Sequence, residues 1–372
     1  MDLRSFTLAE LRERVADAGD PPFRAEQVFR WLHGPGAGGM GGVRIPLAPS
    51  TVPRGLRDAL LASAPLAPLV QDGVFESGDG TRKFRFLTHD GRAIESVLIP
   101  DDKQERSKLT LCISSQAGCA WGCAFCATAT LGFGRNLTAG EIVEQLYWTM
   151  ESVGQKPTNI VFMGMGEPLH NFEQVTRALS IIEHPWGAGL SPRRITVSTS
   201  GVVTGIDLLA KVRPLPNLAI SLNATTDEVR SQLMPVNRRW NIEALLAAAR
   251  RFPLGHHRRV TFEYVLFAGV NDSDMDAARI PKLLGTIPSK VNLIPWNPVS
   301  GLPFQRPSDA RILAFQSMVR RPDLPVYIRT PRGDDAAMAC GQLAARAGEV
   351  SSGFSSGFAS GLYELKATRH VS

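Results

Sequence analysis

The sequence lacks any long apolar run. No stretch of about 18 or more apolar residues occurs in it, so a membrane-spanning helix is not expected. The amino-terminal segment MDLRSFTLAELRERV is charged and helix-like, and it has neither the apolar centre nor the small-residue cleavage site of a secretory signal. We therefore predict a cytoplasmic protein with no membrane partner.

Cysteine is scarce, and its number is odd. The chain has five cysteines, of which Cys112, Cys119, Cys123 and Cys126 fall close together and Cys340 stands apart. An odd number in a chain without a secretion signal argues against a disulfide framework. It indicates metal-binding or catalytic thiols instead.

The first part of the chain is predicted to be a small accessory module, residues 1–104. Residues 7–33 form two short amphipathic helices on either side of a Pro-Pro break, and residues 34–44, GPGAGGMGGVR, indicate a flexible loop. Residues 81–100 indicate a hairpin that turns at His89-Asp90-Gly91. At the other end of the chain, residues 349–372 repeat Ser-Gly-Phe-like units and are expected to be disordered, because they have too few apolar residues to pack.

Residues 105–348 are predicted to form the core, in which apolar strands alternate with helices. Helices are expected at 139–153, opened by the capping-box pair Thr138 and Glu141, and at 241–252. Such alternation indicates parallel βαβ units and an α/β fold, a partial or full (β/α) barrel with its chemistry at the carboxyl ends of the strands. The strands are expected at 109–115, 159–165, 194–200, 217–223, 260–267, 291–297 and 325–330.

The segment QAGCAWGCAFCATATLGFGRNLTAGE (116–141) carries the pattern Cys-x3-Cys-x2-Cys directly after an apolar strand. Three thiolates on a glycine-containing loop can hold one face of a [4Fe-4S] cluster and leave one iron open to a substrate's amino and carboxylate groups. Two alternatives are cysteines packed in a core and a structural zinc site with Cys112 as the fourth ligand. Zinc sites usually pair cysteines as Cys-x2-Cys twice, so the spacing favours a radical SAM enzyme.

Several blocks between Phe23 and Leu343 extend this pattern. They include LTLCISSQAGC, GFGRNLTAGEIVEQ, FMGMGEPLHNF, LAISLNATTDEVR, NLIPWNP and TPRGDDAAMACGQL. In this order they resemble the RlmN/Cfr family of radical SAM RNA methyltransferases, most closely its RlmN branch. The resemblance implies a radical SAM barrel with a [4Fe-4S] cluster and two S-adenosyl-L-methionine (SAM) molecules per turnover.

The resemblance also implies a role for each site residue. Cys119, Cys123 and Cys126 would bind the cluster. Cys340 would be the methyl-carrying thiol, Cys112 the second catalytic thiol and Glu95 a general base. Many relatives have His at the position of Asn223, which we interpret as a binding contact without a proton-transfer role. The expected SAM-binding residues are Gly166, Glu167, Ser198, Ser221, Leu222, Asn223 and Asn297.

The implied activity is methylation of C2 of an adenosine in 23S rRNA and of the adenosine 3′ to the anticodon in tRNA. It would proceed through S-methylated Cys340 and a transient protein–RNA adduct, which Cys112 resolves as a disulfide forms. An external electron donor and a disulfide reductant are therefore expected partners. The net charge of +6 allows a phosphate-bearing partner, and Arg24, Arg30 and His33 of the first helices are candidates to contact RNA phosphates.

Two alternatives remain open at this point. A Cfr-like enzyme would methylate C8 of the adenine, and the choice of carbon depends on the geometry of the pocket. A zinc-bearing RNA-binding protein without catalytic activity would use the same cysteines differently.

Overall fold

The structure is a computed structural model that describes residues 2–34, 51–66, 69–101, 108–255, 257–329, 332 and 341–343. Within these ranges, no helix is both long enough and apolar enough to span a bilayer. Cys340, the Gly-rich stretch after residue 34 and the Ser-Gly-Phe tail lie outside the described residues, and the predictions made for them stay predictions.

The centre of the fold is a single sheet of ten strands in the order β1-β2-β3-β4-β7-β8-β9-β10-β11-β12. From β4 to β12 all neighbours are parallel, whereas β1 to β4 pair antiparallel. β1 and β12 are the two edges, so this sheet forms a partial barrel. The strands are β1 (Val70–Glu76), β2 (Arg82–Leu87), β3 (Ala93–Asp101), β4 (Lys108–Cys112), β7 (Asn159–Phe162), β8 (Ile195–Thr199), β9 (Asn217–Ser221), β10 (Val260–Leu266), β11 (Ser289–Pro295) and β12 (Val326–Ile328).

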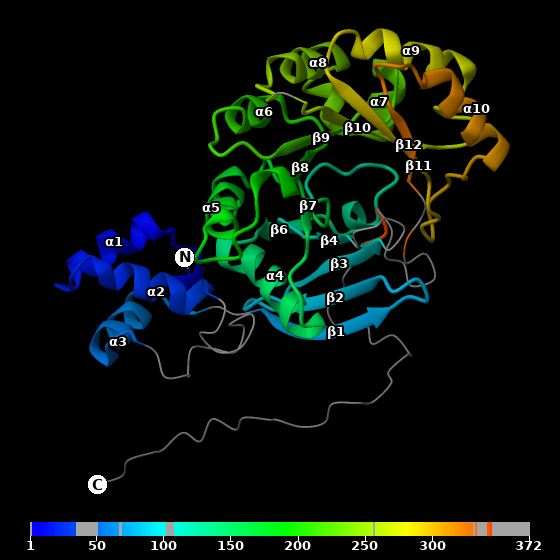
Figure 1. Ribbon diagram of the computed structural model, residues 1–372. Helices are drawn as coiled ribbons and strands as arrows, with labels where there is room; N and C mark the ends of the chain where they lie inside the picture. Colours follow the sequence, from blue (N-terminus) through cyan, green and yellow to red (C-terminus); the bar gives the residue numbers. More distant parts are fainter. Residues whose placement is uncertain are drawn as a thin grey trace.

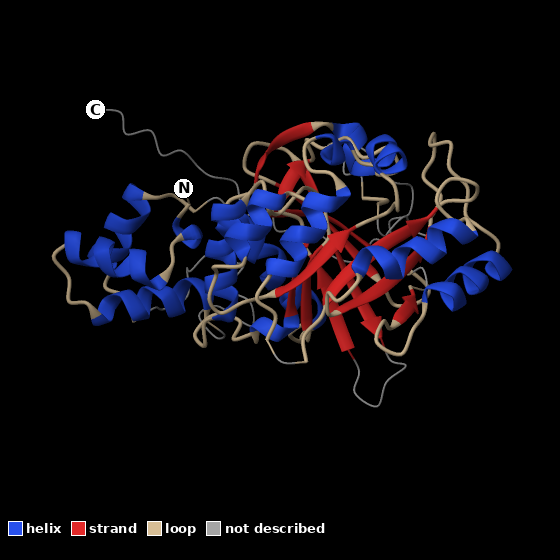
Figure 2. Ribbon diagram, turned by 90° about the horizontal axis from the view of Figure 1, so that it is seen from above, coloured by secondary structure: helices blue, strands red, loops and turns tan. Residues whose placement is uncertain are grey.

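The helices that connect the parallel strands lie along the outside of the sheet (Figures 1 and 2). The Thr138–Glu141 capping box is present, and it opens a helix whose bounds match the predicted 139–153. These helices are α4 (Ala139–Val153), α5 (Phe172–Glu183), α6 (Val203–Leu209), α7 (Asp227–Leu233), α8 (Ile242–Arg251), α9 (Asp274–Leu284) and α10 (Asp309–Val319).

The two faces of the sheet differ in polarity. Side chains alternate between the faces along each strand. Leu111, Ile160, Phe162, Val197 and Ile220 point to the helices and are almost completely buried. The strand register places the intervening residues on the opposite, concave face, which is rich in polar groups. These include Cys112, Thr196, Ser198, Ser221, Glu263 and Asn292.

The predicted hairpin is confirmed as β2 and β3, but it does not stand apart with the first helices. β3 pairs with β4, with Val97 opposite Cys112, so the hairpin is continuous with the barrel sheet. A third strand, β1, was not predicted. The division of the chain into residues 1–104, 105–348 and 349–372 stays a prediction.

The amino-terminal helices pack against α4 through buried polar contacts. Arg4 Nη1 lies 2.5 Å from Glu144 Oε1, and Nδ1 of His33 lies 3.0 Å from the Tyr147 hydroxyl. Burial, then Arg4 and His184, lower the pKa of His33, so its ring is neutral at pH 7. The proposed contact of His33 with RNA is therefore wrong. This segment comprises the 3-10 turn η1 (Leu3–Ser5), α1 (Leu8–Asp17), α2 (Phe23–His33) and α3 (Arg54–Ser63).

Candidate active site

The three clustered cysteines lie on one tight loop at the carboxyl edge of the parallel strands. The loop runs from β5 (Gln116–Gly118) to the 3-10 turn η2 (Ala127–Leu131), and β5 pairs with β6 (Phe133–Asn136) to close its base. The amide of Cys119 donates to the carbonyl of Gly132 at 2.9 Å, and that of Cys126 donates to Cys123 at 3.1 Å. This short two-stranded sheet was not predicted.

Glycine is required at the start of this loop. Gly118 has a φ of +82°, and a Cβ placed there would lie 2.0 Å from the carbonyl oxygen of Gly132. Any side chain would push the two ends of the loop apart, since the clash is with backbone. Gly118 therefore determines the position of Cys119, the first of the three clustered cysteines.

The thiols lie within each other's electrostatic field. Burial raises the pKa of Cys119 to about 11, and the charges of Glu167 and Cys126 add to that rise. Burial also raises the pKa of Cys123, with further contributions from Cys126 and Cys119. Without a nearby cation these groups stay protonated at pH 7. A bound metal would supply the positive charge that converts them to thiolate ligands.

Glu167 follows β7 and is buried beside this loop. Its carboxylate accepts hydrogen bonds from the amide and hydroxyl of Ser200, both at 2.7 Å, and from the amide of Leu169 at 3.0 Å. Gly166 before it has a φ of +98°, and a Cβ there would lie 2.5 Å from Cβ of Gln116. Glycine thus allows the loop after β7 to approach the loop after β4, so that Glu167 reaches the site.

The other predicted SAM contacts lie at the carboxyl ends of neighbouring strands. Ser198 is on β8, Ser221 ends β9, and Asn297 follows β11. Oδ1 of Asn297 is buried and has no hydrogen-bond partner among the described residues. Because buried polar atoms are nearly always paired, this oxygen indicates a missing donor, such as one on a ligand.

Asn223 makes hydrogen bonds within the fold. Its backbone is left-handed, with a φ of 56°, a conformation that Asn tolerates better than most residues. Its Oδ1 accepts from the amide of Val265 at 2.8 Å, and its Nδ2 donates to the sulfur of Met234. The side chain therefore binds within the fold, and its contact with SAM stays a prediction.

Cys112 and Glu95 share the concave face of the sheet. Cys112 ends β4 and lies opposite Val97, two residues from Glu95 on the same face of β3. Both side chains are buried, and Oε1 of Glu95 lies 3.3 Å from Nζ of Lys83. The structure thus places these two predicted residues on one face of two neighbouring strands.

Cys340 is outside the described residues, but the residues directly after it are placed. The amide of Ala127 donates to the carbonyl of Gly341 at 2.8 Å, and the Thr128 hydroxyl donates to that of Leu343 at 2.6 Å. These contacts hold the chain that follows Cys340 against η2, directly after the third clustered cysteine.

Arg230 is a buried site residue that the sequence analysis missed. Its side chain is fully buried on α7, and burial lowers its pKa to about 10, against the opposing effects of Cys123 and Asp227. It donates to four acceptors at 2.6–3.0 Å, namely the carbonyls of Ser200, Ser221 and Leu222 and Oδ1 of Asn237. Arg230 therefore fixes the ends of β8 and β9. One of the residues that it holds is Ser200, which donates hydrogen bonds to Glu167.

Comparisons with known proteins agree with this geometry. Residues 113–279 match the radical SAM superfamily, and residues 1–39 match the ribosomal RNA large subunit methyltransferase N-terminal domain. The dual-specificity RNA methyltransferase RlmN of Anaeromyxobacter sp. (strain Fw109-5) is 47% identical over 93% of this chain and 91% of its own length. RlmN 2 of Myxococcus xanthus (strain DK1622) is 47% identical over 95% of this chain and 93% of its own.

A solved structure is similar as well. The crystal structure of a radical SAM methyltransferase from Sphaerobacter thermophilus has a TM-score of 0.81 and 44% identity, and the match covers 92% of this chain and 99% of that one. The chain belongs to the RlmN family of radical SAM methyltransferases. Its cofactors are accordingly a [4Fe-4S] cluster and SAM.

The thiols of this RlmN-family chain fit a cluster better than a single metal ion. Among the described residues, no three His, Cys, Asp or Glu side chains converge closely enough to hold one ion. In a cubane cluster each cysteine binds a different iron, so its sulfurs stay apart. Three thiols on one loop can each bind a different iron, whereas a tetrahedral zinc site needs its ligands to converge on one ion.

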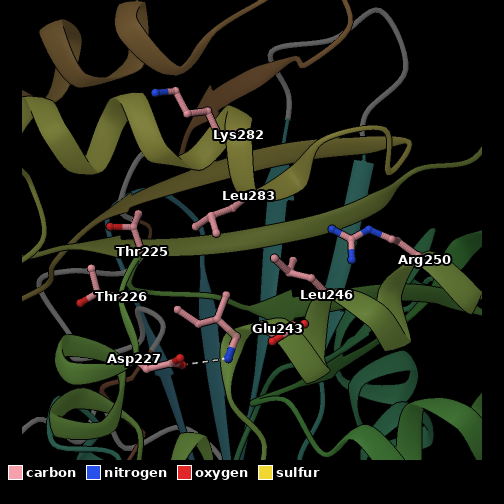
Figure 3. A pocket seen from close by; sticks show the side chains of 9 residues that line it. Thr225, Thr226, Asp227, Glu243, Leu246, Arg250, Lys282 and Leu283 are labelled. Carbon is pink, nitrogen blue, oxygen red and sulfur yellow. Dashed lines mark hydrogen bonds between the residues drawn. The ribbon is translucent and has the colours of Figure 1, made fainter.

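A cleft among the described residues lies elsewhere. It measures about 340 Å³ and lies between α8 and α9, where Leu246, Arg250, Lys282 and Leu283 line it together with Thr225 (Figure 3). None of the predicted site residues of the RlmN-family enzyme lines it. The cleft is on the helical side of the sheet, away from the face that carries Cys112.

Replacement of Arg230 by Met is expected to lower the free energy of unfolding by roughly 3 kcal/mol, because buried carbonyls lose their donor. SAM binding should weaken about tenfold, since Ser200 would no longer be fixed beneath Glu167. Arg230→Lys keeps the charge but not the planar fork, and should be intermediate. Urea denaturation and equilibrium dialysis with SAM would measure both effects. Wild-type stability in the Met variant would contradict this role.

Proposed function

We propose that this protein methylates C2 of an adenosine in 23S rRNA and of the adenosine 3′ to the anticodon in tRNA. The observation that supports this proposal most is that Cys112 and Glu95 lie on the same concave face of the sheet. They lie at the edge of the sheet that also carries Glu167 and the thiol loop. The names of the relatives, dual-specificity RNA methyltransferases, support two RNA substrates. The resemblance to the RlmN branch supports C2 over C8.

The cofactor site is assigned to the carboxyl edge. Cys119, Cys123 and Cys126 bind the cluster, and Glu167 binds the amino group of SAM next to Gly166. Ser198, the segment Ser221–Asn223 and Asn297 complete the SAM site, and the unpaired Oδ1 of Asn297 supports this assignment. When bound, the cluster and SAM supply the radical chemistry.

The remaining steps belong to the protein's own side chains. Cys340 carries the methyl group to the adenine, and Glu95, oriented by Lys83, removes the proton from the ring carbon. Cys112 then releases the product by attacking the Cys340 sulfur, and an external reductant reopens the disulfide. A separate electron donor reduces the cluster.

RNA must present the target adenine on the concave face, so the base is unpaired or flipped out. The amino-terminal helices contribute Arg24 and Arg30 as further phosphate contacts. Arg30 is exposed above the Trp186 ring at 4.1 Å, which leaves its charge accessible.

A strain that lacks this gene and is complemented with the intact chain tests the proposal. Mass spectrometry of nucleosides from purified 23S rRNA and tRNA should show 2-methyladenosine in both, and it should disappear in the deletion strain. Appearance of 8-methyladenosine instead would assign the C8 activity. Unchanged nucleosides in the deletion strain would contradict the proposal.

A further inference from the structure

The loops that precede the parallel strands carry a dense group of cations, which we call the basic rim. The rim lies at the amino edge of the barrel, opposite the thiol loop. Eight of its cations are exposed: Lys156, Arg193, Arg194, Lys211, Arg213, Arg259, Arg320 and Arg321. Lys108, Arg258 and Lys290 are half-buried members of the same rim.

The rim is one continuous surface, because hydrogen bonds connect each loop to the next. Nζ of Lys156 donates to the carbonyl of Ala188 at 2.8 Å, which joins the loops before β7 and β8. Nη2 of Arg258 donates to Oδ1 of Asn217 at 3.0 Å, which joins those before β9 and β10. Arg259 continues the series by donating to the carbonyl of Asp323, before β12, at 2.7 Å.

The acceptors of these cations are neutral. In the sequence, the loops before β7 to β12, at 154–158, 184–194, 210–216, 252–259, 285–289 and 320–325, contain a single acidic residue, Asp323, whereas the loop before β4 contains Asp102 and Glu105. Within the described part of the chain, no rim cation lies within 4.0 Å of a carboxylate, whereas Arg135 and Arg311 elsewhere, and Arg251 at the end of α8 next to the rim, are ion-paired. Burial, and then the positive charge of Arg193, lower the pKa of Arg258, so these two cations lie near each other.

Helix dipoles do not account for the rim. Cations stabilise the carboxyl end of a helix only within about its last turn. Lys211 and Arg320 lie at such ends. Arg193 and Arg194, however, come well after α5 ends at Glu183, and Arg258 and Arg259 come well after α8 ends at Arg251. Helix ends therefore do not explain the positions of these four cations.

The rim also lies close to the concave face. Arg332, which follows β12, lies 3.7 Å from Asp79, between β1 and β2, and 3.9 Å from Asp101, which ends β3 opposite Lys108. Lys108 begins β4 and Cys112 ends it, on the same face. Four residues of extended strand separate the rim from this thiol by roughly 13 Å.

We propose that the basic rim is the surface on which the phosphate backbone of the RNA substrate docks, so that the flipped adenosine enters the barrel from its amino end. Cations without carboxylate partners suit a phosphate backbone, which they hold without reading sequence. This inference rests on the proposed RNA substrate.

The test compares two triple variants of the anaerobically purified holoenzyme. Lys156→Gln/Arg193→Gln/Arg194→Gln removes three rim charges, and the matched control Arg238→Gln/Arg239→Gln/Arg306→Gln removes three from loops at the carboxyl edge. Fluorescence anisotropy with a labelled anticodon stem-loop RNA measures affinity over a range of salt. The rim variant should bind at least tenfold more weakly at low salt, and its slope of log K against log salt should be smaller by about 2.

The control should bind RNA as the wild type does, and both variants should keep the wild-type melting temperature and the same RNA-independent cleavage of SAM. Wild-type affinity and salt dependence in the rim variant would overturn the inference, and so would an equal loss in the control. With either of these two outcomes, the proposed function would still hold as long as the wild-type enzyme methylates RNA. If the wild type neither binds nor methylates RNA, the proposed function itself fails.

Discussion

Replacement of Cys119, Cys123 or Cys126 by Ala is expected to remove the [4Fe-4S] cluster and all methyltransferase activity. A site with three protein ligands has none to spare, and burial makes this environment unfavourable for an uncompensated thiolate. Iron and acid-labile sulfide should fall from about four each per chain to near zero, and SAM cleavage should fall below detection.

Cys112→Ala is the matched control, because it removes a nearby thiol that lies on β4 rather than on the loop. It should keep the full iron and sulfide content. Zinc in place of iron in the wild-type protein, lost equally from Cys112→Ala, would support the zinc-bearing alternative. Full cluster content in any one of the three loop variants would show that the replaced cysteine is not a ligand.

The core strands were predictable because their signals are local. All seven predicted parallel strands are present, since each is a short apolar run in a chain that otherwise alternates with helices. The bounds of α4 were predictable as well, because Thr138 and Glu141 satisfy the first amides of the helix within a single turn. The membership of the sheet was less predictable from the sequence. Its first strand, β1, carries half-buried and exposed residues without a clear alternation.

Contacts between distant segments were not predictable. His33 lies on a helix in which Val28, Phe29, Trp31 and Leu32 are also buried, so the sequence does not show which positions face α4. Arg230 is a charged residue on a short helix, where exposure is the normal expectation. Its burial depends on carbonyls of two strand ends that meet only in the folded sheet.

The candidate catalytic pair illustrates both cases. Cys112 and Glu95 came from the family resemblance, since a single cysteine or glutamate in a strand carries no signal of its own. The register of β3 with β4 then places them on one face. The sequence could not supply this register, which depends on how the hairpin joins the barrel sheet.

The resolving role assigned to Cys112 leads to the sharpest expected result: Cys112→Ala should purify with RNA covalently attached. In the proposed sequence the adenine carbon is joined through a methylene group to the sulfur of Cys340. Attack of the Cys112 thiolate on that sulfur forms a disulfide and breaks the carbon–sulfur bond, and the released carbon takes up a proton to become the methyl group. Without Cys112 nothing attacks the sulfur, so the adduct persists.

Nuclease digestion followed by peptide mass spectrometry should detect a nucleotide mass on the Cys340 peptide of this variant. The double variant Cys112→Ala/Cys340→Ala should carry no RNA, because the bridging sulfur is gone. If Cys112 only packs in the sheet, its replacement should cost about 1 kcal/mol of stability and leave product release intact. Free methylated RNA produced by Cys112→Ala at a near wild-type rate would therefore exclude the resolving role and leave Cys112 as a packing residue of β4.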